Sequence, residues 1–231
     1  MRRFWALAAC AALSSVPSGA VAAAAAGTSE RLPSGTIYVF GETGPNMLGT
    51  NTTRIRADRF SGSWKQALEA ASRSPALQRL VGPARTLNRL QQVAYVQRAV
   101  SSNIRWISDA TEWGQHDYWA TASQTLAHGA GDMEDRAIVK MHALKALGFS
   151  PSDLFLTLAR DRVGGPITVL TVRAGRQYYI LDDTGGTPFA ADSRRFELQP
   201  ILSFGWGGAW IHTRPAAAPA AIALRSRYSR R

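Results

Sequence analysis

The chain has 231 residues, a length that suits one domain with short extensions. Hydrophobic residues make up 45% of it, which is enough for a sizeable core, and 27 Lys and Arg outnumber 16 Asp and Glu to give a formal net charge of +11. The basic residues are scattered along the chain except for a small cluster at its end. This distribution gives little support to a nucleic-acid-binding function, and we expect no nucleic-acid partner.

The first 26 residues have the pattern of a signal peptide. A basic start is followed by an apolar run over residues 5–13 and by small residues at 20–22 that fit a cleavage site. We therefore expect a periplasmic or secreted protein. The sequence "LAAC", which ends at Cys10, also resembles a lipoprotein box, but its apolar run is short, so lipidation stays the weaker alternative.

Cys10 is the only cysteine of the sequence and lies inside this predicted signal peptide. The mature chain would therefore have no thiol, which excludes disulfides, thiolate metal sites and cysteine nucleophiles. No later apolar run reaches the length of a membrane span.

The first half of the mature chain is predicted to be mainly helical. Residues 27–35 have the composition of a linker, 36–40 form a short strand, and 41–53 form a loop rich in Gly and Pro. The pattern then indicates a helix over 63–73 and a long helix over 83–109. After an aromatic loop at 111–121, a capping box of Thr121 and Gln124 predicts a short helix.

A second long helix follows, and after it the apolar period changes to two. Asp132 is a suitable N-cap, acidic residues occupy the first turn, and Gly148 ends the helix. The segments 153–160, 166–173, 177–183 and 201–213 read as antiparallel strands. Helices followed by such strands predict an α+β fold with helices packed on an antiparallel sheet, in one domain over residues 36–214.

The rest of the chain, residues 215–231, is rich in Ala and Pro and then in Arg. A solvated tail is the simplest interpretation. The arginines could also make weak contact with an anionic envelope surface.

The sequence from Val100 to Gly148, "VSSNIRWISDATEWGQHDYWATASQTLAHGAGDMEDRAIVKMHALKALG", resembles the bacterial transglutaminase-like cysteine proteinases, the LapG-like periplasmic enzymes. The family has Trp-Gly, then Asp-Tyr-Trp, then Gly-Asp-Cys-Glu-Asp at the start of a helix that contains Lys. This chain matches with Trp113-Gly114, Asp117-Tyr118-Trp119, Gly131-Asp132, Glu134-Asp135 and Lys140. The resemblance implies a papain-like, transglutaminase-like fold.

Two positions of the family's catalytic triad are changed in this chain. The position of the cysteine nucleophile holds Met133, and a thioether cannot become a thiolate. The position of the histidine falls on or next to Ile167, which cannot act as a base. The third member is retained as Asp182, which alone orients nothing. The resemblance therefore implies a proteinase homologue whose catalytic residues are lost.

The resemblance also implies possible calcium binding, because the acidic residues beside the family's cysteine bind calcium. Asp132 and Glu134 match those positions, and carboxylates are suitable calcium ligands. The alternative is that acidic side chains in a first helical turn balance the helix dipole without any metal. The sequence suggests no other cofactor.

Three hypotheses follow for the function. The first is a catalytically inactive homologue that binds a periplasmic protein or peptide segment. The second is a hydrolase with a relocated mechanism, for which Thr168 is the nearest hydroxyl, provided that a base lies within hydrogen-bond reach of it. The third is a structural envelope protein held by its Arg-rich tail.

Overall fold

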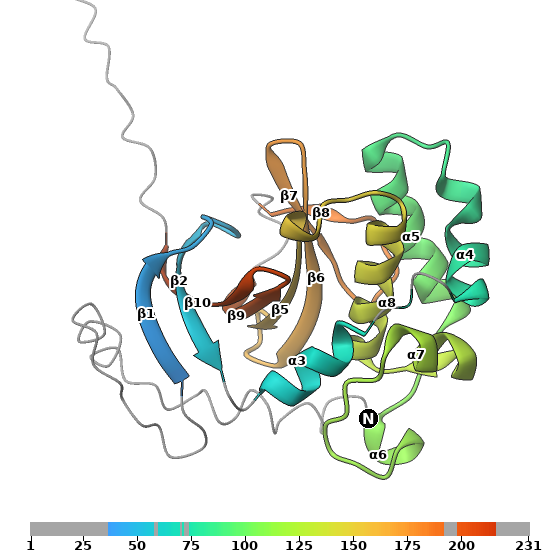
Figure 1. Ribbon diagram of the computed structural model, residues 1–231, viewed down its shortest axis with the longest axis horizontal. Coiled ribbons are helices and arrows are strands. Elements are labelled where there is room, and N and C mark those ends of the chain that lie inside the picture. The colour runs from blue at the N-terminus through green and yellow to red at the C-terminus, as the bar shows by residue number, and fades with distance from the viewer. Residues whose placement is uncertain (1–36, 58–59, 70, 72–73, 192–197, 216–231) are drawn as a thin grey trace, which may run out of the picture.

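In the computed structural model, the helices cover one face of a large antiparallel sheet (Figure 1). The structure describes residues 37–57, 60–69, 71, 74–191 and 198–215. The predicted signal peptide, Cys10, the linker at 27–35 and nearly all of the tail at 215–231 lie outside these residues. Among the described residues, no helix combines the length and the hydropathy that crossing a membrane requires.

Eight strands form the sheet in the order β1-β2-β10-β9-β5-β6-β7-β8, and every neighbouring pair is antiparallel. The strands are β1 Ile37–Thr43, β2 Thr50–Ala57, β5 Leu154–Arg160, β6 Pro166–Ala174, β7 Gln177–Leu181, β8 Phe189–Ala190, β9 Gln199–Gly205 and β10 Gly208–Pro215. Strand β2, near the N-terminus, thus pairs with β10, the last strand described, and β1 pairs with β2 at the edge of the sheet. A separate pair of short parallel strands consists of β3 Arg105–Trp106 and β4 Ala130–Gly131.

The helices come mainly from the middle of the chain. They are α3 Ser61–Ala67, α4 Pro75–Val81, α5 Arg89–Asn103, α6 Asp109–Glu112, α7 Ala122–His128 and α8 Met133–Ala146, with short 3-10 turns η3 Gly82–Ala84 and η4 Pro151–Asp153. Helix α8 is the central one, and its residues from Glu134 to Leu144 are all buried. A helix that is enclosed on all sides in this way organises the core around itself.

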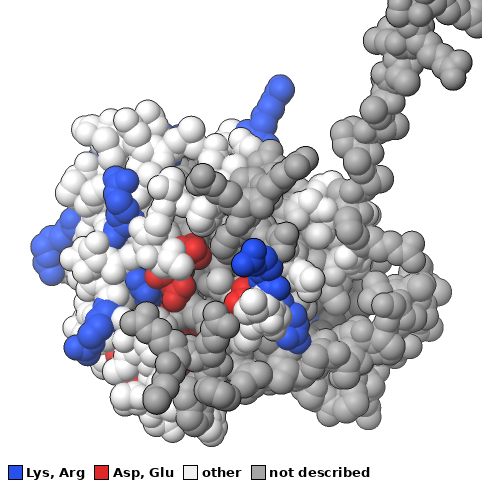
Figure 2. All heavy atoms as spheres, turned by 180° about the vertical axis from the view of Figure 1, so that it is seen from behind, with Lys and Arg blue, Asp and Glu red and all other residues white. Residues whose placement is uncertain are grey.

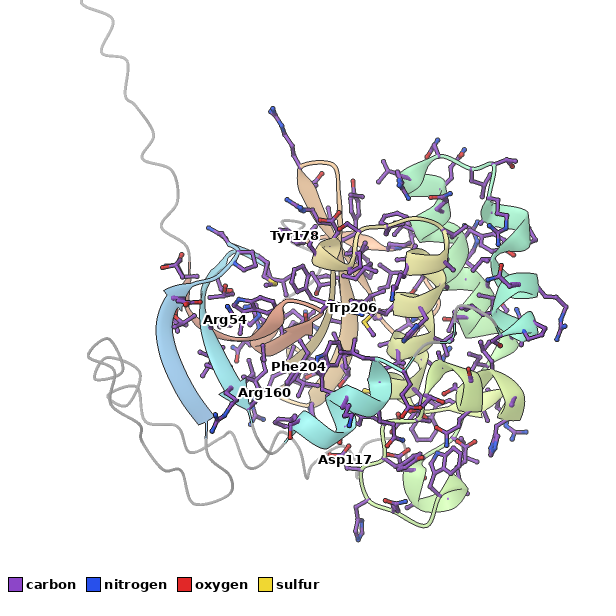
Figure 3. All side chains as sticks on the ribbon, viewed as in Figure 1. Arg54, Asp117, Arg160, Tyr178, Phe204 and Trp206 are labelled. Carbon is purple, nitrogen blue, oxygen red and sulfur yellow. The ribbon has the colours of Figure 1, made fainter. Side chains whose placement is uncertain are left out.

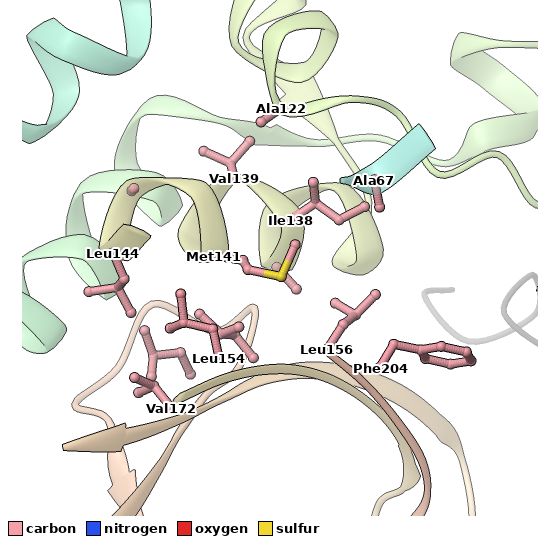
Figure 4. Packing of buried hydrophobic residues seen from close by; sticks show 14 of the residues in the cluster. Ala67, Ala122, Ile138, Val139, Met141, Leu144, Leu154, Leu156, Val172 and Phe204 are labelled. Carbon is pink, nitrogen blue, oxygen red and sulfur yellow. The ribbon is translucent and has the colours of Figure 1, made fainter. Parts of the chain in front are cut away.

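Helix α8 packs on β5 and β6 (Figure 4). Ile138, Met141 and Leu144 of the helix belong to the same apolar core as Leu156 and Val172 of the strands. Each of these side chains is nearly or fully buried, which contributes roughly 1.5–3 kcal/mol per side chain. This packing fixes the position of the helix start relative to the sheet.

Aromatic side chains close the core beside α8. Phe204 of β9 and Trp206, just after this strand, lie between the sheet and the helices (Figure 3). Trp64 of α3 contacts both rings, with centroids at 5.7 and 6.4 Å. Helix α3 is thereby held over this end of the sheet.

Several predicted elements are confirmed, and others are corrected. The strand at 36–40, the capping box at Thr121, the helix from Asp132 and the three strands between 153 and 183 are present. The region 41–53 contains the start of β2, and 201–213 contains two strands rather than one.

The predicted helix over 83–109 is divided. Its main part, α5, begins only after Asn88, whose side chain forms a capping box with Gln91, and Pro83 belongs to η3. The predicted helix over 63–73 starts earlier, at Ser61, and ends at Ala67, and α4 was not predicted.

Candidate functional site

The site is built on the start of α8. Asp132 is the N-cap, and its carboxylate accepts hydrogen bonds from the backbone N–H groups of Glu134 and Asp135 at 3.2 and 3.5 Å. The residue before Asp132 must be glycine or nearly as small, because a Cβ on Gly131 would lie 2.7 Å from the Cβ of Asp135. Because Asp132 is the N-cap, Met133 is the first residue of α8, where the backbone N–H groups have no partner within the helix.

Thr168 is the residue of β6 that reaches this helix start. Its hydroxyl donates to a carboxylate oxygen of Glu134 at 2.6 Å, and both side chains are buried. Leu170 and Val172 of the same strand face the helices and belong to the apolar core. Alternate residues of a strand point to opposite faces, so Thr168, Leu170 and Val172 share the face that α8 covers.

Ile167 consequently lies on the other face of the sheet. Its neighbour across β5 is Ala159, whereas Thr168 is paired with Leu158, a residue of the core under the helices. The sequence predicts the histidine position on or next to Ile167, and Thr168 is one of the residues next to it. The side chain presented to the helix start at this point of β6 is that of Thr168.

Asp182 lies just beyond β7 and is held by residues of two helices. One carboxylate oxygen accepts from Gln97 Nε2 of α5 at 2.9 Å and from the Thr184 hydroxyl at 2.8 Å. Its backbone carbonyl accepts from Lys140 Nζ of α8. The Asp182 carboxylate thus binds the Gln97 amide and the Thr184 hydroxyl of the loop after β7.

Lys140 is buried, as is Asp182, whose carbonyl it binds. Desolvation, and to a lesser degree the charge of Arg136, lowers the pKa of Lys140 to about 7. The lysine that completes the family motif therefore fastens the loop after β7 to the central helix.

Three carboxylates converge beside the helix start. Oxygens of Asp109, Asp132 and Asp135 all lie within 4.8 Å of one another. Asp109 comes from the start of α6 and is fixed by the backbone N–H of Tyr118 at 2.6 Å. Asp135 is fixed by the backbone N–H of Ala120 at 2.8 Å.

Each of the two anchored carboxylates keeps one oxygen without a partner. Oδ1 of Asp109 and Oδ2 of Asp135 are buried and have no hydrogen bond within the described part of the chain. Buried carboxylate oxygens of this kind are costly unless they are protonated or bind a cation. The arrangement is therefore chemically suited to a divalent cation with a preference for oxygen ligands.

The electrostatics of the cluster agree with this interpretation. Burial raises the pKa of Asp109 to about 6 and that of Asp135 to about 8, with smaller contributions from the neighbouring acidic groups. Burial also raises the pKa of Asp132 well above its ordinary value, and that of Glu134. Without a cation, the cluster holds protons at pH values at which isolated aspartates are ionised.

The predicted calcium pair is brought together only in part. Asp132 belongs to the three-carboxylate cluster, whereas a Glu134 oxygen is occupied by Thr168. Asp109 and Asp135 were not predicted as ligands. Asp135 sits in the quoted motif and was available, but Asp109 is 26 positions away in sequence from Asp135, and no local pattern shows that contact.

The hydrogen bonds of His128, His142 and His212 in the described part of the chain involve neither Met133 nor Thr168. His142 Nε2 bonds the Ala67 carbonyl at 2.8 Å, and His128 pairs with Glu112. His212 lies on the far strand β10, with Ser203 at 2.8 Å and Thr50 at 2.6 Å.

Comparisons with known proteins agree with this architecture. Two structures of LapG from Legionella pneumophila are similar to this chain. One has 24% sequence identity and a TM-score of 0.50, over 65% of this chain and 86% of LapG. The calcium-bound form has 22% identity and a TM-score of 0.52, over 73% of this chain and 93% of LapG. The predicted transglutaminase-like fold is thereby confirmed.

The sequence comparisons identify the family. No curated protein matches the chain. The family model of the bacterial transglutaminase-like cysteine proteinases matches residues 68–188, slightly more than half of the chain and including the start of α8, Thr168 and Asp182. The chain belongs to the bacterial transglutaminase-like cysteine proteinase family.

Proposed function

We propose that this chain is a non-cleaving member of its family that binds a protein or peptide segment. The observation that carries the proposal is Met133 at the first position of α8, between the family's acidic residues. A thioether has no proton to lose and cannot attack a carbonyl carbon. Asp182 is engaged by Gln97 and Thr184, so the third triad position is used for structure.

Calcium binding is part of this proposal. Asp109, Asp132 and Asp135 would hold the ion, and the two unpartnered buried oxygens are the observation that favours it. A bound divalent cation would supply positive charge to the cluster. The three residues themselves would then tie the loop before α7 to the first turn of α8, which is the surface next to Met133.

The location follows from the sequence pattern alone. We propose that residues 1–26 direct export, that 27–35 form a linker, and that 36–214 act outside the cytoplasm in the periplasm or in the secreted fraction. The partner would then be a periplasmic protein or an exposed segment of one.

A binding assay with variants of the helix start tests the proposal. The exported full chain is titrated with an array of fluorescent peptides, with and without calcium. We expect peptides that bind without being cleaved, and Met133→Trp should weaken this binding. Val163→Trp is the matched control because Val163 is 66% exposed on a loop between β5 and β6.

Two outcomes would contradict the proposal. Cleaved peptides in the mass spectrum would show an active enzyme. Equal peptide binding by both tryptophan variants would place the binding surface away from the helix start. Circular dichroism of each variant confirms that the fold is kept.

A hydrolase with a relocated mechanism is the second candidate, and one observation favours it. Thr168 has a carboxylate within hydrogen-bond reach, Glu134 at 2.6 Å, and burial raises the pKa of that carboxyl. A hydroxyl beside such a group is a recognised arrangement for nucleophilic attack. Thr168 is only 3% exposed, however, which leaves a substrate little access. Hydrolysis of activated esters that is lost in Thr168→Val but kept in Met133→Trp would favour this candidate.

A further inference from the structure

A groove runs between helices α4, α5 and α7, away from the start of α8. It has a volume of about 380 Å³, most of its lining residues are apolar in type, and polar atoms make up about half of its accessible lining. The apolar residues include Leu80 of α4, Tyr95 and Ala99 of α5, Ile104 after α5, and Leu126 of α7. None of the three clustered carboxylates, Met133 or Thr168 lines it.

The groove exists because small residues face each other where the helices meet. Ala76 of α4 and Ala99 of α5 leave space that larger side chains would fill. The end of α7 opens the same space, since its C-cap is Gly129 in the left-handed conformation with φ of 64°. The Tyr95 hydroxyl donates to the Leu80 carbonyl at 3.1 Å, which fixes the aromatic wall. The groove is thus built into the packing of the helices.

The surface around the groove is strongly basic. Residues 70–108, which contain α4 and α5, include six arginines and no Asp, Glu or Lys. The space-filling view shows basic side chains spread over the helical part of one face, with acidic ones gathered nearer its centre (Figure 2).

Three of these arginines stand next to the groove. Arg79 lines it, Arg98 precedes Ala99, and Arg105 follows Ile104. All three are exposed and have no acidic partner in the part of the chain that the structure describes. By contrast, Arg85 bonds Gln78, and Arg89 bonds the carbonyls at the end of α8.

We propose that this groove is a docking site for an acidic segment of another protein, in which apolar side chains alternate with Asp or Glu. The apolar walls would bury the hydrophobic side chains of the segment. The arginines would pair with its carboxylates, a match of geometry and charge that the planar guanidinium favours. This site is separate from the peptide-binding surface proposed at Met133, and it stands or falls on its own observations.

A nucleic acid fits the groove less well. Proteins that bind single strands present exposed aromatic faces for base stacking along a basic track. Here the walls are mostly aliphatic, and the one lining aromatic ring, Tyr95, is fixed to α4 by its hydroxyl. The groove therefore suits leucine-like side chains rather than bases.

Fluorescence anisotropy with the full chain tests the docking site. Three labelled peptides are compared: Glu alternating with Leu, Lys alternating with Leu, and Glu alternating with Ser. A single-stranded oligonucleotide is the fourth probe. We expect the Glu–Leu peptide to bind most tightly, and its affinity to fall as salt screens the arginines.

Variants of the groove locate the binding. Ala99→Trp fills the space and should weaken the Glu–Leu peptide by roughly tenfold or more, the size of effect seen at a buried interface position. Arg79→Gln with Arg98→Gln should weaken it as well and reduce its salt dependence. Arg176→Gln, in the exposed turn between β6 and β7, is the matched charge control. Because Ala99→Trp could unfold the helices, Ala76→Trp on the facing helix serves as the second filling variant.

The controls also separate this site from the proposed peptide-binding surface. Met133→Trp should leave the affinity for the Glu–Leu peptide unchanged. The docking site is wrong if folded groove variants bind this peptide as the unchanged protein does. It is also wrong if the oligonucleotide binds more tightly than the Glu–Leu peptide and responds to the same variants.

Discussion

The Thr168 hydroxyl donates to the Glu134 carboxylate at 2.6 Å and joins the first turn of the central helix to strand β6 of the sheet. Both side chains are buried, and burial raises the pKa of Glu134. In a site without a thiol, this pair fills the space between helix and strand with a polar contact that must be satisfied.

Thr168→Val should destabilise the protein because it leaves the buried Glu134 oxygen without its donor. The expected loss is about 1–3 kcal/mol in the free energy of unfolding. Thr168→Ser keeps the hydroxyl and should lose less. Urea unfolding of the three proteins, each in the presence of a calcium chelator, measures the difference. Equal midpoints for the original protein and the valine variant would show that the contact contributes nothing.

Calcium should raise the unfolding temperature of the protein, since a ligand that binds only the folded state stabilises it. Asp135→Asn should reduce this shift strongly, because the ion loses a charged ligand held in place by the Ala120 N–H. Glu42→Gln, an exposed change on β1, is the control and should keep the shift. Thermal unfolding with and without a chelator, together with calorimetric titration, measures both effects. An unchanged unfolding temperature on adding calcium would contradict the calcium site.

Protons should compete with calcium at this cluster. The folded-state pKa values of about 6 for Asp109 and about 8 for Asp135 lie above the ordinary value of 3.8. The metal-free folded state therefore binds more protons than the unfolded state between pH about 4 and about 8, so this contribution to stability falls as pH rises through that window. Calcium affinity should rise over the same window. A calcium affinity that does not change between pH 6 and 8 would contradict these shifts.

His212 should make folding stability depend on pH in the opposite direction to the aspartate cluster. It is neutral in the fold, with Ser203 on one ring nitrogen and Thr50 on the other, and burial lowers its pKa to about 4. The unfolded state takes up a proton near pH 6.5 and the folded state only near 4, so stability should fall as pH drops through this window. His212→Gln should remove that decline. Unfolding curves of both proteins at several pH values give the difference, and parallel curves would refute the assignment.

The parts of the site that could be predicted are those whose sequence pattern lies within a few neighbouring residues. The Asp132 cap and the strands around Thr168 follow from neighbouring residues, and they are present. Neighbouring residues do not show which side chains of β6 face the helix. Both faces of this strand are buried along its centre, so the alternation of polar and apolar residues is lost. The sequence therefore gives the histidine position only as on or next to Ile167, and the structure shows that the Thr168 side chain is the one that reaches the helix.

The place of Asp109 in the carboxylate cluster was missed for a different reason. The pattern predicts one helix over 83–109, although Asn88 and Gln91 form a capping box that marks a new start. With the helix divided, Asp109 begins α6 and turns toward α8. Contacts of this kind join residues that are distant in sequence, so the sequence pattern indicated the acidic helix start but not the whole cluster.

Met133→Cys tests whether the helix start keeps the electrostatic properties of a catalytic one. Two effects oppose each other at this position. The N-terminus of α8 stabilises a thiolate, while the carboxylates of Asp132, Glu134 and Asp135 next to it disfavour a second negative charge. Calcium bound to the cluster would cancel much of the repulsion. We therefore expect the thiol pKa of the variant to be lower with calcium than with a chelator, and below the free value of about 8.5 in the calcium form. The rate of alkylation as a function of pH measures this thiol pKa, and the unsubstituted protein, processed to remove Cys10, is the blank.

Peptide cleavage by Met133→Cys alone should stay absent because position 168 carries no imidazole. Adding Thr168→His, rather than a histidine at 167, is the change that should supply a base on the correct face of β6. A thiol pKa near the free value under both conditions would show that neither the helix end nor the carboxylate cluster acts on this position.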